Sequence, residues 1–298
     1  MNSLVSVLKS SRANFLILPI VCVFLGTAIA YRLTGHVVIV DVLLVLLGAL
    51  MANVSVNLLN EYQDFTSGLD AMTVKTPFSG GSGALLVHPE AAALTFSAAV
   101  FSFVITAAVG IYFIYVHGVA LLPLGLLGLL IIGVYTNWLT RYPLLCLIAP
   151  GLGLGPLMVT GTSYVLMDGY SRAAFLASLT PFFLVSELLL INQFPDVEAD
   201  KQVGRRHFPI TLGRGPSARI YVAFLLLSFA PIAVGVGIGL FPRMTLLGLI
   251  PLLAALPLAY QVLRKAEKSR ELIPYLGMNV AVIMSIIILF ALGWFFKF

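Results

Sequence analysis

Half of the acidic residues in this chain lie in two short windows. Of the twelve Asp and Glu residues, the first window holds Glu61, Asp64 and Asp70, and the second holds Asp196, Glu198 and Asp200. In each window an Asn precedes an Asp by four residues, Asn60 before Asp64 and Asn192 before Asp196. Residues four apart share one face of a helix. We therefore expect a first ridge of Asn60 and Asp64 and a second ridge of Asn192, Asp196 and Asp200.

Crowded carboxylates of this kind indicate a cation site. They repel one another unless a positive charge lies among them. Mg²⁺ prefers carboxylate oxygens and commonly bridges them to substrate phosphates. Basic residues occur in or near the same segments, namely Lys75, Arg141, Lys201, Arg205 and Arg206. The pattern predicts a clamp for a metal-bound diphosphate. The alternative is a pair of solvated helix ends with local ion pairs, which two matched windows on one side make less favourable.

The elements that must position these residues are membrane-spanning helices. The 298-residue chain is 60% hydrophobic and 10% charged, whereas soluble domains carry about 25% charged residues. A helix crosses a bilayer with about 20 apolar residues, and we expect nine such segments, at roughly 14–31, 37–59, 91–116, 119–138, 143–166, 173–192, 218–240, 244–263 and 274–296. The predicted fold is an all-α polytopic membrane bundle forming a single domain over 1–298. This composition excludes a soluble enzyme with one anchor and a disordered chain.

The distribution of basic residues predicts the orientation of the bundle. With nine spans and the N-terminus inside, thirteen of the seventeen Lys and Arg residues fall on the inner side. Cytoplasmic loops carry such an excess, so we expect residues 61–90 and 193–217 to be cytoplasmic and the C-terminus to lie outside. The net charge of +5 is then explained by topology. The lipid bilayer of a prokaryotic cytoplasmic membrane is an expected partner, and nucleic acid is not.

The two windows also resemble a known family. Asn60-x-Tyr62-x-Asp64-x3-Gly68-x-Asp70 and Asn192-x3-Asp196-x3-Asp200 are similar to the two Asp-rich motifs of the UbiA superfamily of intramembrane prenyltransferases. Tyr135 through Arg141, Gly151–Gly161, Gly204 and Thr211–Gly213 are similar to other segments of that superfamily. The first motif looks most like the menaquinone-pathway branch, which prenylates 1,4-dihydroxy-2-naphthoate. Glu61, Pro195 and the loop Thr76–Gly83 depart from that branch.

This resemblance implies a reaction and a set of site residues. Two Mg²⁺ ions would be held by Asn60, Asp64, Asp70, Asn192, Asp196 and Asp200, with Asp64 and Asp196 essential for catalysis. Substrate would be bound by Lys75, Tyr135, Arg141, Lys201 and Arg205. The donor would be a polyprenyl diphosphate, which ionises to an allylic carbocation that an aromatic acceptor attacks. Naphthoate is the first acceptor expected, and hydroxybenzoate, homogentisate, a porphyrin or a glycerol lipid are alternatives.

Three further features have a functional and a structural interpretation. Glu187 lies within an apolar segment, where carboxyl groups are rare and often functional. We expect it to be catalytic, binding an acceptor hydroxyl or taking its proton; the alternatives are a hydrogen bond to another helix or a protonated carboxyl group. Asn53 and Asn57 continue the first ridge into the membrane and either line the acceptor pocket or bond between helices. The run Gly80–Gly83 either offers backbone N–H groups to phosphate or forms a lid.

A second class of function is a cation-coupled transporter. Acidic residues in such proteins bind coupling ions, and their sites lie near the middle of the bilayer on broken helices. In this chain most of the acidic residues are expected at the end of the spans and in loops. That position favours the enzyme.

Overall fold

The structure, a computed structural model, describes residues 2–73, 75–76 and 79–296, and these ranges contain helices and no strand. Eight helical segments are long and apolar enough to cross a membrane: Ile17–Thr34, Ile39–Thr66, Pro89–His117, Pro143–Met167, Arg172–Asn192, Arg214–Gly237, Arg243–Lys265 and Ser269–Gly293. A shorter apolar helical segment spans Val119–Val134. The described residues thus confirm the all-α membrane bundle, and each predicted apolar segment corresponds to one of these elements.

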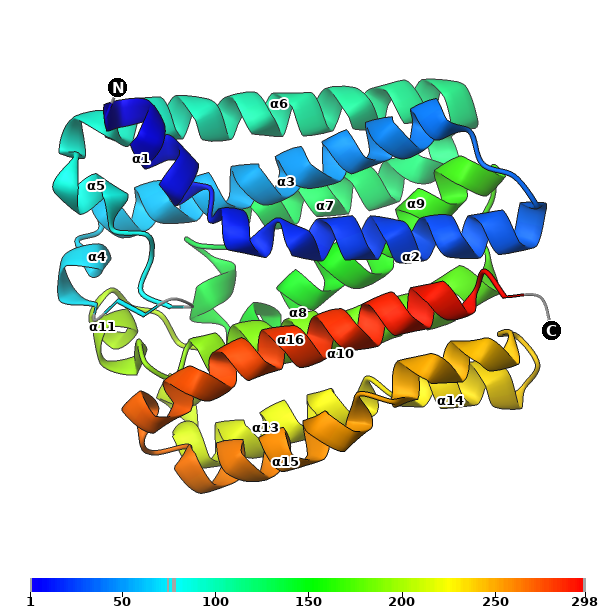
Figure 1. Cartoon of the computed structure of the whole chain (residues 1–298). Coiled ribbons are helices and arrows are strands. Elements are labelled where there is room, and N and C mark those ends of the chain that lie inside the picture. The colour runs from blue at the N-terminus through cyan, green and yellow to red at the C-terminus, as the bar shows by residue number, and fades with distance from the viewer. Residues whose placement is uncertain (1, 74, 77–78, 297–298) are drawn as a thin grey trace.

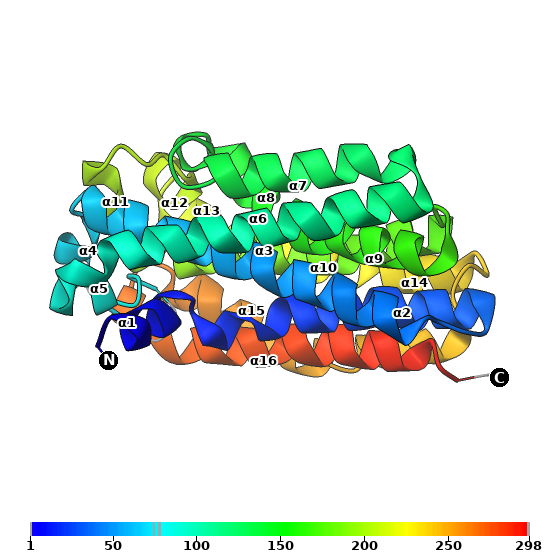
Figure 2. The same cartoon turned by 90° about the horizontal axis from the view of Figure 1, so that it is seen from above.

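The helices lie along a common direction and pack side by side (Figures 1 and 2). Extensively packed pairs include α3 (Ile39–Thr66) with α6 (Ala92–His117), α2 (Ile17–Thr34) with α9 (Met158–Met167), α10 (Arg172–Asn192) with α8 (Pro143–Leu152) and α13 (Arg214–Leu227), and α16 (Ser269–Gly293) with α2 and α15 (Leu252–Lys265). Helix α10 is the most buried of the spans, with 67% of its most apolar stretch inside the bundle. It therefore forms the centre of the fold.

Several spans are interrupted where proline and glycine occur. The segment after α8 makes a π-helical turn, η5 (Gly153–Leu157), before α9 begins. Pro150 and Pro156 lack the N–H that a regular helix needs, and such turns accommodate the missing bond. A Cβ at Gly151 would overlap the carbonyl oxygen of Phe182. Glycine is therefore required for this segment to approach α10.

The later spans are also divided, and short elements connect the helices. The seventh predicted segment is α13 followed by α14 (Ala230–Gly237), and the eighth begins with the 3₁₀ helix η6 (Arg243–Leu249). η2 (Pro89–Ala91) begins the span that continues as α6, and η3 (Val119–Leu121) begins the shorter apolar segment that continues as α7 (Leu122–Val134). Other connecting elements are η1 (Ala13–Phe15) and η4 (Leu139–Arg141).

One end of the bundle carries the N-terminal helix and both long connections. Helices α1 (Asn2–Ser10), α4 (Leu69–Met72), α5 (Ala84–Val87) and α11 (Val197–Gln202) lie at this end, and the C-terminal end of the chain lies at the other (Figure 1). Helix α12 (Phe208–Thr211) follows α11 in the second connection. This arrangement agrees with the expectation that the N-terminus and both acidic windows share one side.

The two ridges differ in their backbone. The first lies on one continuous helix as expected, because α3 continues to Thr66. The expectation of a continuous second ridge is wrong: α10 ends at Asn192, residues 193–196 form a turn, and α11 starts at Val197. The cause is Pro195, which has no N–H to donate to the preceding turn. Asp200 still donates its backbone N–H to the Asp196 carbonyl at 2.9 Å.

Candidate functional site

A cavity of about 580 Å³ extends from the polar end of the bundle into its apolar interior. Its inner wall is formed mainly by apolar residues of α3, α6, α7 and α9 and by η5. Ten of the fourteen predicted site residues line it: Asn53, Asn57, Asn60, Asp64, Asp70, Tyr135, Asn192, Asp196, Asp200 and Arg205. The structure therefore brings the two acidic windows, far apart in sequence, to one site.

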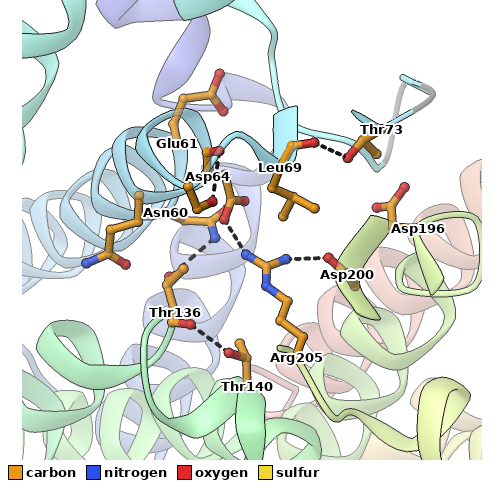
Figure 3. Close-up of polar contacts among 12 residues, drawn as sticks. Asn60, Glu61, Asp64, Leu69, Thr73, Thr136, Thr140, Asp196, Asp200 and Arg205 are labelled. Atoms are coloured by element: carbon orange, nitrogen blue, oxygen red, sulfur yellow. Dashed lines mark hydrogen bonds and ion pairs between the residues drawn. The ribbon is translucent and has the colours of Figure 1, made fainter. Parts of the chain in front are cut away.

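Arg205 lies between the two ridges (Figure 3). Its guanidinium donates Nη2 to Asp64 Oδ1 of the first ridge and Nη1 to Asp200 Oδ1 of the second, the latter at 2.8 Å. The other oxygen of Asp200 lies 2.8 Å from Nε2 of His207, which is 1% exposed and lines the cavity. Both oxygens of Asp200 are thus bonded to side chains of the chain itself.

Arg12 is a site residue that the sequence reasoning missed. Its Nη2 donates to Asn60 Oδ1 at 2.8 Å and lies 3.6 Å from Glu61 Oε2, and the residue lines the cavity. It adopts a left-handed conformation, with φ of 52°, at the junction of α1 and η1. In the sequence its charge contributed only to the topology prediction. No spacing relates it to the acidic windows, and this contact between distant segments could not be predicted locally.

The glycine-rich loop covers the polar end of the cavity. The Gly80 N–H donates to Asp196 Oδ2 at 3.0 Å, and the Ser82 N–H donates to the buried Glu61 carboxylate at 3.0 and 3.1 Å. A Cβ at Gly81, whose φ is +70°, would lie 2.5 Å from Asp70 Oδ1. The described part of this loop therefore contacts the acidic residues of both windows, which favours the lid interpretation.

Three buried oxygens at this end have no hydrogen-bond partner among the described residues: Asp70 Oδ2, Asn192 Oδ1 and Asp196 Oδ1. Burial, followed by the nearby carboxylates of Glu61 and Asp64, raises the pKa of Asp70 to about 7. Burial and the carboxylate of Asp200 likewise raise the pKa of Asp196 to about 7. Unpaired oxygens of this kind are suited to a hard cation. Across the described ranges, however, no three Asp, Glu, His or Cys side chains are grouped closely enough to hold one.

The predicted basic residues are only partly brought together. Arg205 lies in the site, but Lys75, Arg141 and Lys201 are exposed and do not line the cavity. Arg141 borders a separate hollow of about 80 Å³ that it shares with Asp64 and Arg205. The charges of these residues were visible in the sequence, but the direction of their side chains depends on how the segments between the helices fold.

The asparagines on α3 are oriented as the pocket interpretation requires. Asn53 and Asn57 both line the cavity, and Asn57 Nδ2 donates to Asn53 Oδ1 at 3.0 Å and to the Ser11 carbonyl at 3.1 Å. They provide polar groups below the acidic end in a wall that is otherwise mostly apolar. Tyr135, at the end of α7, lines the same region.

Glu187 is not brought to the cavity, contrary to expectation. It is fully buried on the opposite side of α10, where its Oε2 accepts a hydrogen bond from Asn279 Nδ2 of α16 at 2.9 Å. Asn279 Oδ1 in turn accepts from the Tyr221 hydroxyl of α13 at 2.9 Å. The alternative interpretation, a bond between helices, accounts for this residue.

We expect Glu187→Gln to leave the KM for both substrates unchanged, because the amide can keep a bond to Asn279 and the residue does not face the cavity. Glu187→Leu should lower the free energy of unfolding by about 1–3 kcal/mol, since it leaves the buried Asn279 amide unpaired. Steady-state kinetics and thermal unfolding in detergent check both. A rise in the KM for the acceptor in Glu187→Gln, with thermal stability unchanged, would indicate that Glu187 does contact the acceptor.

The comparison with known families identifies the chain. A profile described as the UbiA prenyltransferase family matches residues 19–283, which is most of the sequence. The chain belongs to the UbiA prenyltransferase family. Prenyl transfer is therefore its class of reaction, and the resemblance inferred from the two acidic motifs is confirmed.

Individual proteins and solved structures are also similar to this UbiA family member. It is 28% identical, over 228 residues covering 74% of this chain and 70% of the relative, to a 1,4-dihydroxy-2-naphthoate octaprenyltransferase of Bacillus subtilis (strain 168). A structure of digeranylgeranylglyceryl phosphate synthase matches with a TM-score of 0.69 at 14% identity, covering 99% of each chain. A UbiA homolog from Archaeoglobus fulgidus bound to GPP and Mg²⁺ matches with a TM-score of 0.60 at 14% identity, covering 96% of this chain and 99% of the other. These structural matches show a shared fold.

Proposed function

We propose that this chain transfers a polyprenyl group from a polyprenyl diphosphate to 1,4-dihydroxy-2-naphthoate, an aromatic acceptor. One observation carries this assignment: a single cavity has both acidic motifs at its polar end and an apolar wall over the rest of its length. A polyprenyl diphosphate has the same division into a charged head and an apolar tail. The naphthoate acceptor is supported by the B. subtilis relative and by the form of the first motif.

Mg²⁺ is the cofactor that this site fits best. The unpaired oxygens of Asp70, Asn192 and Asp196 are hard ligands pointing into a buried site, and Asp64 and Asp200 lie across it. The solved UbiA homolog with GPP also carries Mg²⁺. Bound there, Mg²⁺ would supply positive charge that stabilises the leaving diphosphate. Phosphate oxygens would complete a ligand shell that the protein alone does not close.

The side chains of the chain itself would then do three things. Arg205 and Arg12, both lining the polar end, would hold the diphosphate as negative charge builds on it. The apolar wall would exclude water from the allylic carbocation. Asn53, Asn57 and Tyr135 would orient the acceptor ring so that an electron-rich carbon attacks that cation. The attacked carbon would then lose the group it carried, a proton or, at the carboxyl-bearing carbon, carbon dioxide, and the ring would regain its aromaticity. The carboxylates lie at the end of the bundle, which also disfavours a transporter with a midplane site.

The experiment that tests this assignment is a panel of acceptors. Membranes containing the protein are incubated with a polyprenyl diphosphate, Mg²⁺ and either the naphthoate, hydroxybenzoate, homogentisate, a porphyrin or a glycerol lipid, and products are identified by mass. We expect prenylated naphthoate as the main product. Exclusive prenylation of another acceptor would exclude naphthoate and leave the reaction class intact.

Metal binding should depend on pH. Protons compete with Mg²⁺ for Asp70 and Asp196, whose pKa values are raised to about 7. Below that pH the metal must displace protons, so we expect its apparent affinity to increase as pH rises through about 7 and to level off above it. Titration of the purified protein with Mn²⁺, followed by electron paramagnetic resonance, measures this directly. A Mn²⁺ affinity that does not change across this pH range would contradict the proposed metal site.

We further propose that the acidic end faces the cytoplasm, as the distribution of basic residues predicts. Gln202 on α11 and Arg172 at the start of α10 are both exposed and lie at the two ends of the bundle. Since Cys22 and Cys146 are buried, we expect Gln202→Cys to react with an impermeant maleimide only in inverted vesicles and Arg172→Cys only in intact cells. The reverse pattern would invert the topology.

A further inference from the structure

Arg205 occupies the position between carboxylates where the proposed function needs a cation. Its guanidinium bonds to Asp64 and to Asp200, one carboxylate from each window. Arg205 is largely buried, and Asp64 and Asp200 are 6% and 2% exposed. Two buried carboxylates facing each other without a cation would repel strongly. Arg205 therefore offsets one of the two negative charges and bridges the pair in the protein alone.

Five of the candidate metal-binding residues accordingly fall into two groups. Asp64 and Asp200 have oxygens engaged by Arg205, and His207 holds the remaining oxygen of Asp200 at 2.8 Å. Asp70, Asn192 and Asp196 each keep a buried oxygen without a partner among the described residues. A cation entering the second group finds open ligands. A cation approaching Oδ1 of Asp64 or of Asp200 must displace a guanidinium that is already bonded there.

We propose that Arg205 is an internal counter-cation that blocks metal binding by Asp64 and Asp200 until the diphosphate arrives and draws the guanidinium onto its phosphate oxygens. This inference rests on the proposed function, because it assigns an order of events to the same site. Guanidinium pairs with phosphate as well as with carboxylate, through the same two-pronged geometry. The exchange therefore releases two carboxylate oxygens for metal while the arginine keeps an anionic partner.

Metal loading is then coupled to donor loading. Without the diphosphate, only the group of Asp70, Asn192 and Asp196 is open to metal. With it, Asp64 and Asp200 become available at the moment when charge on the leaving group must be stabilised.

Metal binding without diphosphate tests this assignment. Mn²⁺ is titrated into wild type, Arg205→Gln and Arg206→Gln in detergent at one alkaline pH, and free Mn²⁺ is measured by electron paramagnetic resonance. Arg206 is the matched control, because it carries the same charge one residue away, is exposed and does not line the cavity. We expect Arg205→Gln to bind Mn²⁺ at least about tenfold more tightly, the scale on which a residue beside a metal site alters affinity. Arg206→Gln should match wild type.

Use of the prenyl diphosphate donor should become weaker in Arg205→Gln, whereas metal binding becomes tighter. Arg205→Gln should raise the KM for the prenyl diphosphate while metal affinity increases, a combination that a merely damaged fold would not give. If Arg205→Gln does not fold, Arg205→Lys is used: it keeps the charge but not the fork that spans both carboxylates, and we expect it also to bind Mn²⁺ more tightly than wild type. Unchanged or weaker Mn²⁺ binding in the folded variant overturns the counter-cation role. Absence of turnover in the wild type itself would instead overturn the proposed function.

Discussion

We expect Asp64→Asn and Asp196→Asn each to reduce turnover by about a hundredfold or more, the loss typical when charge stabilisation at a reacting group is removed. Each residue lines the polar end of the cavity on a different ridge. Asparagine keeps the shape of the side chain and a hydrogen-bonding oxygen but loses the negative charge that attracts metal. The effect should therefore appear in the rate of prenyl transfer rather than in folding, and steady-state kinetics with saturating Mg²⁺ measures it.

Glu198→Gln is the control for these variants. Glu198 belongs to the same acidic window and lies two residues from both Asp196 and Asp200, but it is exposed and does not line the cavity. Its substitution removes the same unit of charge and should leave turnover close to wild type. Equal losses in Glu198→Gln and Asp196→Asn would indicate a general effect of charge at this end and would contradict the specific role of Asp196.

Gly125→Leu should restrict the length of the prenyl donor. Gly125 lies on α7 far from the acidic end, lines the apolar part of the cavity, and a Cβ there would meet no atom within 4 Å. A leucine would project into the space that a long tail needs, and overpacking of this kind costs about 1–3 kcal/mol. We expect turnover with a long polyprenyl diphosphate to fall about tenfold or more, while a short donor such as geranyl diphosphate is still used.

Gly133→Leu provides the comparison on the same helix. Gly133 also has open space around its Cα and is exposed, but it does not line the cavity. Its substitution should affect long and short donors equally. Loss of the long-donor reaction in both variants, or in neither, would show that the tail does not run along α7.

The helical bundle could be predicted from composition because a bilayer imposes simple requirements. A span needs about 20 apolar residues, and all its backbone groups must be bonded within the helix, so long apolar segments were sufficient to place every span. The breaks within spans depend on tertiary contacts. Pro150 and Pro156 mark the π-helical turn, but whether such residues interrupt a span depends on what packs against them, here the Phe182 backbone beside Gly151.

The acidic half of the site could be predicted, and the rest of its polar contacts could not. Asp64 and Asp196 were identifiable because their spacing to Asn60 and Asn192 is a local pattern. Arg12 was not, because it reaches Asn60 across 48 residues of sequence. Glu187 was misplaced for a related reason: its position within an apolar segment could be predicted, but the face of the helix that it occupies depends on Asn279 of α16.

The most direct test of the central claim is a structure determined by electron cryo-microscopy in a lipid nanodisc. The sample would contain the protein, Mg²⁺ and a non-reactive thiodiphosphate analogue of the donor. We predict that the diphosphate lies between Asp64 and Asp196 at the polar end, with Arg205 on its phosphate oxygens and the tail running along α7 past Gly125. Density for the diphosphate outside the space between the two acidic windows, with the cavity occupied by lipid alone, would contradict this account.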